Sequence, residues 1–402
     1  MKILHVVPTY YPAVRYGGPI RSVHGLASAL ADQGHNVHVY TTNVDGDGVS
    51  PVRLDEPTQL DGVSVWYFAT SIGRRLYRSP GMRGALAANV ASFDVIHLHS
   101  VFLWPTSVAA QAARKQGVPY VLSPRGMLVA DLIRRRSSLA KRSWIALFER
   151  SNIEKAAAIH LTSEIEASEF RALGFRCARS AIVANGIELP ASELLGSDPG
   201  EASANGAGRP YVLFLGRLNW KKGIDRLIPA MAQVRHADLL LAGNDEENYR
   251  PELEALARRC GVFDQVRFLG PVDDERKWSL LSSAQILALP SYSENFGNVV
   301  LEAMAARCPV IVTPEVGIAG VVREARCGIV TEGDPEKLGL EIKRLLADAE
   351  LCEKMGRAGR HVVEAKYAWR GIAQQMLDLY NEILISRRGS VGAGTLACCS
   401  NV

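Results

Sequence analysis

The chain has 402 residues, of which 48% are hydrophobic and 22% are charged, values typical of a globular protein with two or three domains. The net charge of +4 is too small to indicate a nucleic-acid partner. Seven scattered cysteines without a C-x-x-C pair indicate free thiols in a reducing compartment. No apolar run reaches the roughly 18 residues of a membrane-spanning helix, and the apolar start of the chain is too short for a signal peptide, so we expect a cytoplasmic protein.

The first part of the chain alternates short apolar runs with amphipathic stretches. Residues 2–7 and 36–41 are expected to form buried strands, with a helix over residues 22–34 between them. This βαβ order begins a doubly wound parallel sheet. Gly17-Gly18 precedes the helix, and a glycine pair lets the backbone approach a ligand phosphate, although an ordinary turn is the alternative. The chain has no G-x-G-x-x-G or Walker sequence, which argues against dinucleotide oxidoreductases and ATPases.

The next strand-like run, residues 94–100, contains His99 close to its end. Ligands of α/β sheets bind beyond the carboxyl ends of the strands, so His99 is a candidate site residue. A histidine that is satisfied inside the structure is the alternative. Residues 118–123 form another expected strand and lead into the loop Pro-Arg-Gly-Met-Leu of residues 124–128.

The segment 131–148 is expected to be a basic helix. Cationic side chains at 134–136, 141 and 142 alternate with apolar residues. Such a helix can lie on an anionic membrane surface. A core-packed helix with a solvated charged face is the alternative.

A segment rich in Gly, Ser and Ala, residues 188–209, interrupts the alternation of strands and helices and is interpreted as an interdomain linker. The alternation restarts over residues 210–368, where two expected strands end at Gly243 and at Gly270-Pro271. The fold class is therefore α/β, with one parallel-sheet domain over residues 1–187 and a second over 210–368.

The loop of residues 216–223 combines glycine with positive charge. Arg217 and Lys222 bracket the expected start of a helix, a position that favours anions. An arginine can bridge two phosphate oxygens, and a lysine adds a mobile charge. Surface charge beside a helix is the alternative.

Two glutamates flank another strand-to-helix junction. Glu294 follows an apolar strand, residues 286–289, and Glu302 lies about one turn into the helix that starts near Gly297 and Asn298. The backbone N–H groups of this helix start form an anion site. If each carboxylate binds hydroxyl groups while the helix start faces phosphates, the ligand has the layout of a nucleotide sugar. An exposed loop acid and a solvated helix residue are the alternative.

The motif around these glutamates resembles a known family. Ser293-Glu294-Asn295-Phe296-Gly297, with Glu302 after it, is similar to the Glu-x7-Glu signature of glycosyltransferase family 4, whose members are retaining enzymes with the GT-B fold. Residues 216–223 resemble the family's Gly-Arg-Leu-x3-Lys-Gly motif in full. Three more segments match: Gly17-Gly18, the His-x-His run that ends at His99, and Gly270-Pro271.

The resemblance covers nearly all of residues 2–385. It implies two Rossmann-like domains facing a central cleft, with a helix over 369–388 that crosses back onto the N-terminal domain. Residues 389–402 are expected to be a disordered, dispensable tail because they are rich in Gly, Ser and Ala. The chain departs from many members at Gly320, where they have a glutamate, which leaves the detail of donor or acceptor binding open.

The resemblance implies a retaining hexosyltransferase that moves a sugar from a nucleotide-sugar donor to a glycan or lipid-linked acceptor in cell-surface polysaccharide synthesis. Glu294 would orient the sugar and His99 would stabilise its developing cation, while Arg217 and Lys222 neutralise the leaving diphosphate. The donor-binding set is then Glu302 at the ribose with Gly17, Gly18, Gly243, Gly270, Pro271, Asn295, Phe296, Gly297 and Asn298. The Arg-Gly-Met-Leu loop places Arg125 and Gly126 on the acceptor side.

No metal or other cofactor is expected. Asp45-Gly46-Asp47 has the form of a metal-binding Asp-x-Asp pair, but it lies in a Gly-rich loop after the second strand. The GT-B enzymes that the chain resembles are metal-independent. Two other functions stay open: a nucleotide-sugar 2-epimerase of the same fold, and a noncatalytic protein on the membrane surface. The Arg-Gly-Met-Leu loop argues against the epimerase, because an epimerase has no acceptor to bind. A noncatalytic protein would leave four charged residues unexplained: Arg217, Lys222, Glu294 and Glu302.

Overall fold

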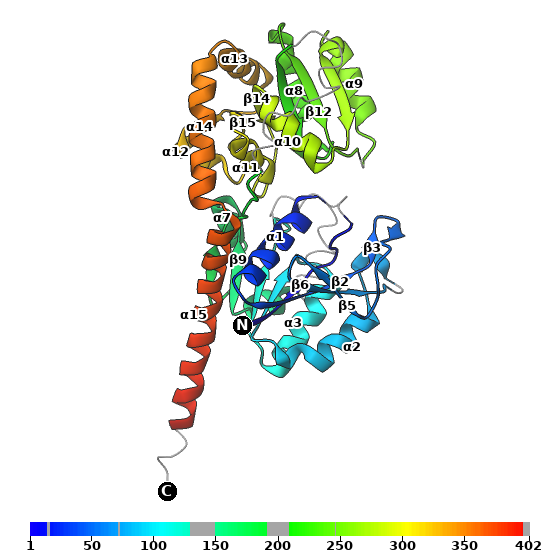
Figure 1. Cartoon of the computed structure of the whole chain (residues 1–402), viewed down its shortest axis with the longest axis vertical. Helices are drawn as coiled ribbons and strands as arrows, with labels where there is room; N and C mark the ends of the chain where they lie inside the picture. The colour runs from blue at the N-terminus through cyan, green and yellow to red at the C-terminus, as the bar shows by residue number, and fades with distance from the viewer. Residues whose placement is uncertain (14–16, 71–72, 129–148, 191–208, 246, 397–402) are drawn as a thin grey trace. The chain divides into compact units, whose positions relative to one another are not determined.

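The computed structural model describes residues 1–13, 17–70, 73–128, 149–190, 209–245 and 247–396, so the basic segment 131–148 and most of the linker 188–209 lie outside the described residues. The chain divides into unit 1, Met1–Gly186 with Trp369–Val402, and unit 2, Ile187–Ala368 (Figure 1). Within the described ranges, no helix is both long enough and apolar enough to cross a bilayer.

Unit 1 is built on an eight-stranded sheet in the order β10-β9-β8-β7-β1-β2-β6-β5. Neighbouring strands pair in parallel except at one edge, where β5 runs antiparallel to β6. The chain starts in the middle of the sheet and winds outward in both directions, as in a doubly wound fold. The strands are β1 (Lys2–Val6), β2 (Asn36–Thr42), β5 (Pro57–Leu60), β6 (Val63–Phe68), β7 (Val95–His99), β8 (Tyr120–Ser123), β9 (Ala158–Leu161) and β10 (Ser180–Ile182).

Helices cover both faces of this sheet because successive strand residues point to opposite sides. Core residues of α1 (Gly18–Asp32) and α15 (Trp369–Leu396) pack with Ile3, Val37 and Val95 on one face. The opposite face, which includes Leu4 and Ile96, packs against α2 (Pro80–Asn89), α3 (Trp104–Gln116), α6 (Arg150–Glu154) and α7 (Glu164–Ala172). Smaller elements are β3 (Val44–Asp45), β4 (Gly48–Val49), η2 (Arg74–Leu76) and η3 (Val90–Ser92).

Helix α15 joins unit 1 although it follows unit 2 in the chain. Its first residue, Trp369, packs its indole ring so closely on Gly25 and Gly186 that a Cβ atom at either glycine would overlap the ring. The helix continues to Leu396, so residues 389–396 are helical, which corrects the expectation that the whole tail is disordered. Extending an existing helix by a residue costs much less than nucleating a new one. Residues 397–402 lie outside the described residues.

Unit 2 has a six-stranded, all-parallel sheet in the order β13-β12-β11-β14-β15-β16. Counted from β11, this is the 3-2-1-4-5-6 order of a dinucleotide-binding fold. The strands are β11 (Tyr211–Leu215), β12 (Asp238–Ala242), β13 (Val266–Gly270), β14 (Ile286–Leu289), β15 (Val310–Val312) and β16 (Gly328–Val330). The prediction of two doubly wound parallel sheets is confirmed.

The unit 2 strands are connected by helices, three of which begin at an aspartate cap. Asp273, Asp334 and Asp348 each accept a backbone hydrogen bond at the start of a helix, a common N-cap arrangement. The helices are α8 (Ile224–Ala230), α9 (Arg250–Arg259), α10 (Asp274–Ser283), α11 (Asn298–Ala305), α12 (Ala319–Ala325), α13 (Pro335–Leu346) and α14 (Ala349–Lys366), with η7 (Trp220–Lys222), η8 (Met231–Gln233) and η9 (Phe263–Gln265).

Candidate active site

The candidate residues cluster where the strand order of each sheet reverses. In unit 2 this point lies between β11 and β14, and the loops after these strands are 216–223 and 290–297. In unit 1 it lies between β1 and β7, which are followed by the Gly17-Gly18 loop and by the loop that starts after His99. Ligands of doubly wound sheets bind at such switch points, beyond the carboxyl ends of the strands.

Glycines bring the unit 2 loops together. Gly223 has φ 68° and Gly243 has φ 142°, both in the region that favours glycine. A Cβ atom at Gly223 would overlap the Pro290 carbonyl, and one at Gly243 would overlap the Gly216 carbonyl. The Gly243 N–H also donates to the Gly270 carbonyl at 2.8 Å. The predicted donor-binding glycines Gly243 and Gly270 therefore lie at the same sheet edge as the 216–223 loop and fix its shape.

Lys222 and Glu294 meet in unit 2. The Lys222 ammonium and the Glu294 carboxylate form an ion pair, and their side chains are only 20% and 19% exposed. The backbone of Glu294 is held on both sides, since its N–H donates to the Glu315 carbonyl at 3.1 Å and its carbonyl accepts from the Gly317 N–H at 2.9 Å. The loop therefore presents the carboxylate from a fixed backbone position.

Helix α11 begins at Asn298, and its N-cap is Gly297, with φ 97° and no side-chain cap. The helix therefore starts at the Gly297–Asn298 junction, as expected from the sequence. A Cβ atom at Gly297 would approach Val316 Cγ1 to 2.9 Å, so a left-handed glycine is needed at this junction. Phe296 is only 5% exposed and anchors the loop in the core. The start of a helix carries a partial positive charge, which favours a negatively charged ligand.

Glu302 pairs with a lysine that sequence reasoning missed. Lys277 Nζ lies 2.9 Å from Glu302 Oε1 and 2.9 Å from Asp274 Oδ1, and the lysine is only 8% exposed. A buried lysine is rare unless it is paired. Lys277 lies on α10 next to buried Trp278, at the point where a charged run gives way to apolar residues, and this position was the available signal.

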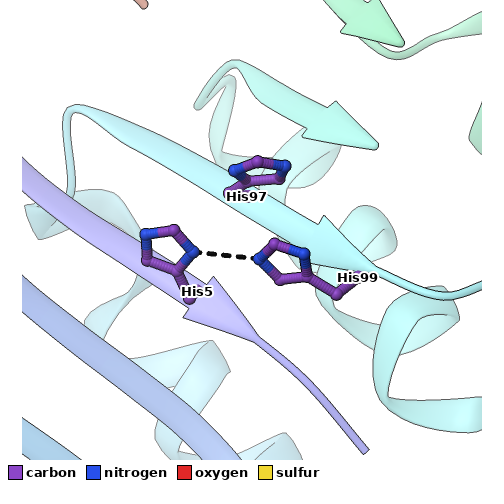
Figure 2. Close-up of side chains that lie close together, drawn as sticks. All are labelled: His5, His97 and His99. Atoms are coloured by element: carbon purple, nitrogen blue, oxygen red, sulfur yellow. Dashed lines mark hydrogen bonds between the residues drawn. The ribbon is translucent and has the colours of Figure 1, made fainter. Parts of the chain in front are cut away.

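Unit 1 contains a layer of buried histidines. His5 on β1 is the register partner of His97 on β7, and His99 follows two residues later on the same face of the strand. All three are at most 2% exposed, and His160 on β9 is also buried. Figure 2 shows His5 reaching across from its strand to His99, with a hydrogen bond of 2.9 Å between His5 Nδ1 and His99 Nε2.

The hydrogen bonds around His99 determine its tautomer. The Arg125 guanidinium, at 3.2 Å, can only donate, so His99 Nδ1 is the acceptor and His99 Nε2–H donates to His5 Nδ1. His5 Nε2–H then has no acceptor among the described residues. Arg125 also donates to Asn185 Oδ1 at 2.8 Å and to Ser22 Oγ at 3.3 Å, which fixes its guanidinium.

A second chain of hydrogen bonds runs through His97 and His160. His160 Nε2–H donates to the Val183 carbonyl at 2.8 Å, so its Nδ1 accepts from His97 Nε2–H at 3.2 Å. His97 Nδ1 accepts in turn from the Tyr380 hydroxyl of α15 at 2.7 Å. Both histidines are neutral in this arrangement.

Burial keeps the whole layer uncharged. Desolvation, with a smaller contribution from the Arg125 charge, lowers the pKa of His5 to about 3 and that of His160 to about 3. The pKa values of His97 and His99 lie well below the ordinary value for the same main reason. Burial also lowers the pKa of Arg125 to about 10, which still leaves it charged at neutral pH.

The predicted acceptor-side residues occupy structural positions in unit 1. Arg125 has φ 55° and directs its guanidinium to His99, Asn185 and Ser22. The Gly126 N–H donates to the Glu166 carboxylate at 2.7 Å. Of the predicted donor-binding residues, Gly17, with φ 72°, caps α1, which begins at Gly18. All four predicted residues thus lie at the same edge of the unit 1 sheet as His99.

Neither metal candidate has surroundings that suit a cation. The nitrogen atoms of His5, His97 and His99 lie within 4.8 Å of one another, but they take part in the hydrogen bonds above and lie against the charged Arg125. The Asp45-Gly46-Asp47 segment forms the β3–β4 turn, where the Arg74 guanidinium donates to the carbonyls of Gly46 and Gly48. A fixed positive charge therefore already occupies that turn.

Comparisons with known proteins establish the family. A model described as glycosyl transferases group 1 matches residues 201–362, and a glycosyl transferase 4-like domain matches residues 17–186. The chain therefore belongs to the group 1, family 4-type glycosyltransferases, and the family predicted from its motifs is confirmed.

Two similar proteins cover nearly the whole chain. An uncharacterized glycosyltransferase of Methanocaldococcus jannaschii is 28% identical over 401 residues, which are 94% of this chain and 98% of that protein. A D-inositol 3-phosphate glycosyltransferase of Xylanimonas cellulosilytica is 27% identical over 410 residues, 94% of this chain and 95% of that protein.

Solved structures establish the fold. A sucrose-phosphate synthase from Thermosynechococcus elongatus matches with a TM-score of 0.77 at 24% identity, over 96% of this chain and 100% of the other. An Anabaena protein in complex with UDP-glucose matches with a TM-score of 0.74 at 20% identity, over 95% and 100%. The fold is GT-B, as the motif resemblance predicted.

Proposed function

We propose that this protein is a retaining, metal-independent hexosyltransferase that moves a sugar from a nucleotide-sugar donor to a glycan or lipid-linked acceptor in cell-surface polysaccharide synthesis. The proposal rests on one observation above all: Arg217, Lys222, Glu294, Glu302 and the start of α11 lie around the switch point of the unit 2 sheet. The UDP-glucose complex of the similar Anabaena protein supports a nucleotide-sugar donor. The enzyme is proposed to act in the cytoplasm, with the segment 131–148 as a contact to anionic lipids.

The leaving diphosphate is proposed to bind at the 216–223 loop and the start of α11. Arg217 is exposed in this loop, and Lys222 is held beside it by η7. When a phosphate oxygen takes the place of the Glu294 carboxylate on the Lys222 ammonium, Glu294 becomes free to accept hydrogen bonds from sugar hydroxyls. Donor binding would thus convert an internal ion pair into two contacts with the ligand.

Glu302 is proposed to bind the ribose hydroxyls of the donor. Lys277 holds the Glu302 carboxylate at 2.9 Å through one oxygen, which leaves the second oxygen for a ligand. Lys277 is therefore a positioning residue for this contact.

In the proposed reaction the bond between the anomeric carbon and the diphosphate oxygen breaks while the acceptor oxygen bonds to the same face of that carbon. The acceptor hydroxyl gives its proton to the leaving diphosphate, whose new charge is neutralised by Arg217, Lys222 and the N–H groups of α11. His99 is proposed to stabilise the positive charge that develops on the sugar, through its backbone or its ring, whose orientation is fixed by the hydrogen bonds to Arg125 and His5.

Incubating the protein with a panel of nucleotide sugars, with and without candidate acceptors, tests the function. Transfer requires both substrates and leaves the anomeric configuration unchanged. Conversion of a nucleotide sugar into its epimer without any acceptor would identify a 2-epimerase instead. Binding to vesicles without turnover of any donor would identify a noncatalytic membrane protein.

Chelation should leave the transfer rate unchanged. Two cationic side chains and a helix start neutralise the diphosphate in this scheme, so a divalent cation has no role to fill. The measurement compares initial rates in magnesium and in excess EDTA. A complete and reversible loss of rate in EDTA would overturn metal independence.

The two glutamates should differ in their kinetic effects. The ribose does not change during transfer, so Glu302→Ala should mainly raise KM for the donor. The loss of one charged hydrogen bond should weaken the free energy of donor binding by about 1–3 kcal/mol. Glu294→Ala should lower kcat as well, because its contacts are to the reacting sugar. Steady-state kinetics of both variants give the comparison. Full activity of Glu294→Ala would remove this residue from the reacting centre.

A further inference from the structure

A hollow of about 440 Å³ on unit 1 has no part in the reaction scheme above. It lies between α2 and the first residue of α3, two helices that pack side by side (Figure 1). The residues that line it are Arg78, Pro80, Arg83, Gly84, Ala87 and Trp104. Its volume is in the range of sites for small organic ligands, about 300–1,000 Å³.

One face of α2 forms the floor of this hollow. Pro80, Arg83, Gly84 and Ala87 follow the i, i+3, i+4, i+7 spacing of a single helix face, while Met82 and Leu86 are buried in the core on the far side. Gly84 and Ala87 have little or no side chain, so this face of the helix leaves space for a ligand in the hollow. A Cβ atom at Gly84 would meet nothing within 4 Å, so the floor is open to a ligand.

The hollow has positive charge without a matching acid. Arg78 and Arg83 are exposed, and neither side chain makes a hydrogen bond or ion pair with another described residue. By contrast, the nearby Arg74 is engaged with the β3–β4 turn. The sequence has no Asp or Glu between Asp61 and Asp94.

One carboxylate does approach α2 from another side. Asp55 Oδ1 would lie 3.1 Å from a Cβ atom at Gly81, which is not on the face that lines the hollow. The two arginines therefore keep their positive charge at the hollow itself.

Trp104 forms the wall of the hollow on a rigid support. It is the first residue of α3 and is half-buried. The loop that leads to it from His99 is held by Thr106 Oγ1, which can donate to the carbonyls of His99 at 3.3 Å and Ser100 at 3.0 Å. The Phe102 N–H donates to the buried Glu149 carboxylate at 2.9 Å. The wall is thus a fixed aromatic surface five residues beyond His99.

We propose that this hollow is an acceptor subsite that binds a negatively charged sugar. The arginines pair with a phosphate or carboxylate on the sugar, and the indole of Trp104 packs against the C–H face of its ring. Arginine suits planar, bidentate binding of either anion, and an aromatic ring gives apolar contact area at little entropic cost. The inference rests on the proposed transfer reaction, because it assigns a chemical class to the acceptor.

The shape of the site favours a discrete sugar over a membrane surface. A lipid bilayer is contacted by convex apolar and basic surfaces, whereas the charges here flank a concave volume with an aromatic wall. The position at the carboxyl-end edge of the sheet, where β7 ends in His99, also suits a substrate.

Binding of four probes to the full chain tests the proposal by calorimetric titration: glucose 6-phosphate, glucuronate, glucose and inorganic phosphate. We expect both acidic sugars to bind, with glucose and phosphate at least about tenfold weaker, since each lacks one half of the recognition. Arg78→Ala and Arg83→Ala should each weaken binding of the acidic sugars about tenfold, the effect of losing one charged hydrogen bond. Arg75→Ala is the matched control, because Arg75 is exposed three residues away and does not line the hollow.

A second variant fills the hollow without changing its charge. Gly84→Trp should weaken binding of the acidic sugars at least about tenfold and leave the helix intact, since a glycine in a helix interior is less favourable than other residues. Equal binding of acidic sugars by the wild type, Arg78→Ala and Gly84→Trp would overturn the proposal. So would loss of binding to phosphatidylglycerol vesicles in Arg78→Ala when no acidic sugar binds, because that identifies a lipid contact.

Titration with UDP separates this proposal from the function on which it rests. UDP should bind equally to the wild type and to Arg78→Ala, since Arg78 is not among its proposed contacts. If UDP binds and no acidic sugar does, the subsite is wrong and the transferase function stands. If acidic sugars bind at the hollow and no nucleotide binds anywhere, the subsite stands as a sugar-binding site and the transferase function fails.

Discussion

Replacing Arg217 with alanine is expected to lower kcat by about 10²–10³, the loss typical of removing one preorganised donor from a developing negative charge. The charge on the diphosphate rises as its bond to the sugar breaks, so the contact is stronger in the transition state than in the ground state. The effect should therefore appear in kcat and kcat/KM rather than in KM alone. Steady-state rates over a range of donor concentrations provide the measurement.

Arg235→Ala is the matched control for this experiment. Arg235 is also an exposed arginine of unit 2, but it precedes β12 and so lies at the amino-end edge of the sheet, away from the 216–223 loop. Its removal should change kcat less than twofold. If Arg217→Ala raised KM with no change in kcat, the arginine would bind a part of the donor that does not react, and the scheme for the leaving group would be wrong.

The parts of the site that could be predicted are the loops whose characteristic residues lie close together in the sequence. The 216–223 loop and the strand-to-helix junction at Gly297 each combine glycine, charge and an apolar strand within a few residues. Parallel sheets place such loops at one edge, so the alternation of strands and helices was enough to expect both loops at the carboxyl-end edge of the unit 2 sheet.

The pairings within the site could not be predicted because they join distant segments. Lys277 and Glu302 lie on different helices, and Lys222 and Glu294 follow different strands. Only the order of strands in the sheet brings these partners together. The antiparallel edge strand β5 was also missed, because its sequence, Pro-Thr-Gln-Leu, has no clear apolar alternation.

The histidine layer could have been predicted more fully from the positions of its histidines in the sequence. His97 and His99 are two residues apart on one strand, which places both on one face, and His5 and His160 lie in apolar runs of their own. Motif resemblance identified His99 alone. The register of β1 with β7, which sets His5 opposite His97, is a property of the folded sheet.

This layer should make the protein sensitive to mild acid. A histidine whose pKa is lower in the folded than in the unfolded state makes the unfolded state bind more protons below pH 6.5. The stability of unit 1 should therefore be at its full value above pH 6.5 and fall as the pH drops from 6.5 towards 3. At pH 5.5 each such histidine costs about 1.4 kcal/mol, so His5 and His160, with pKa values of about 3, together cost about 3 kcal/mol.

Urea unfolding at pH 7.5 and at pH 5.5 measures this loss as a difference in the free energy of unfolding. His97 and His99 shift in the same direction and add to it. Glutamine can both donate to the Val183 carbonyl and accept from His97, so His160→Gln should keep the hydrogen bonds and reduce the difference by about 1.4 kcal/mol. His236→Gln, at an exposed position of unit 2, should leave the difference unchanged. Equal free energies of unfolding at the two pH values would mean that the layer is protonated in the folded protein, and the tautomers assigned to His5 and His99 would then be wrong.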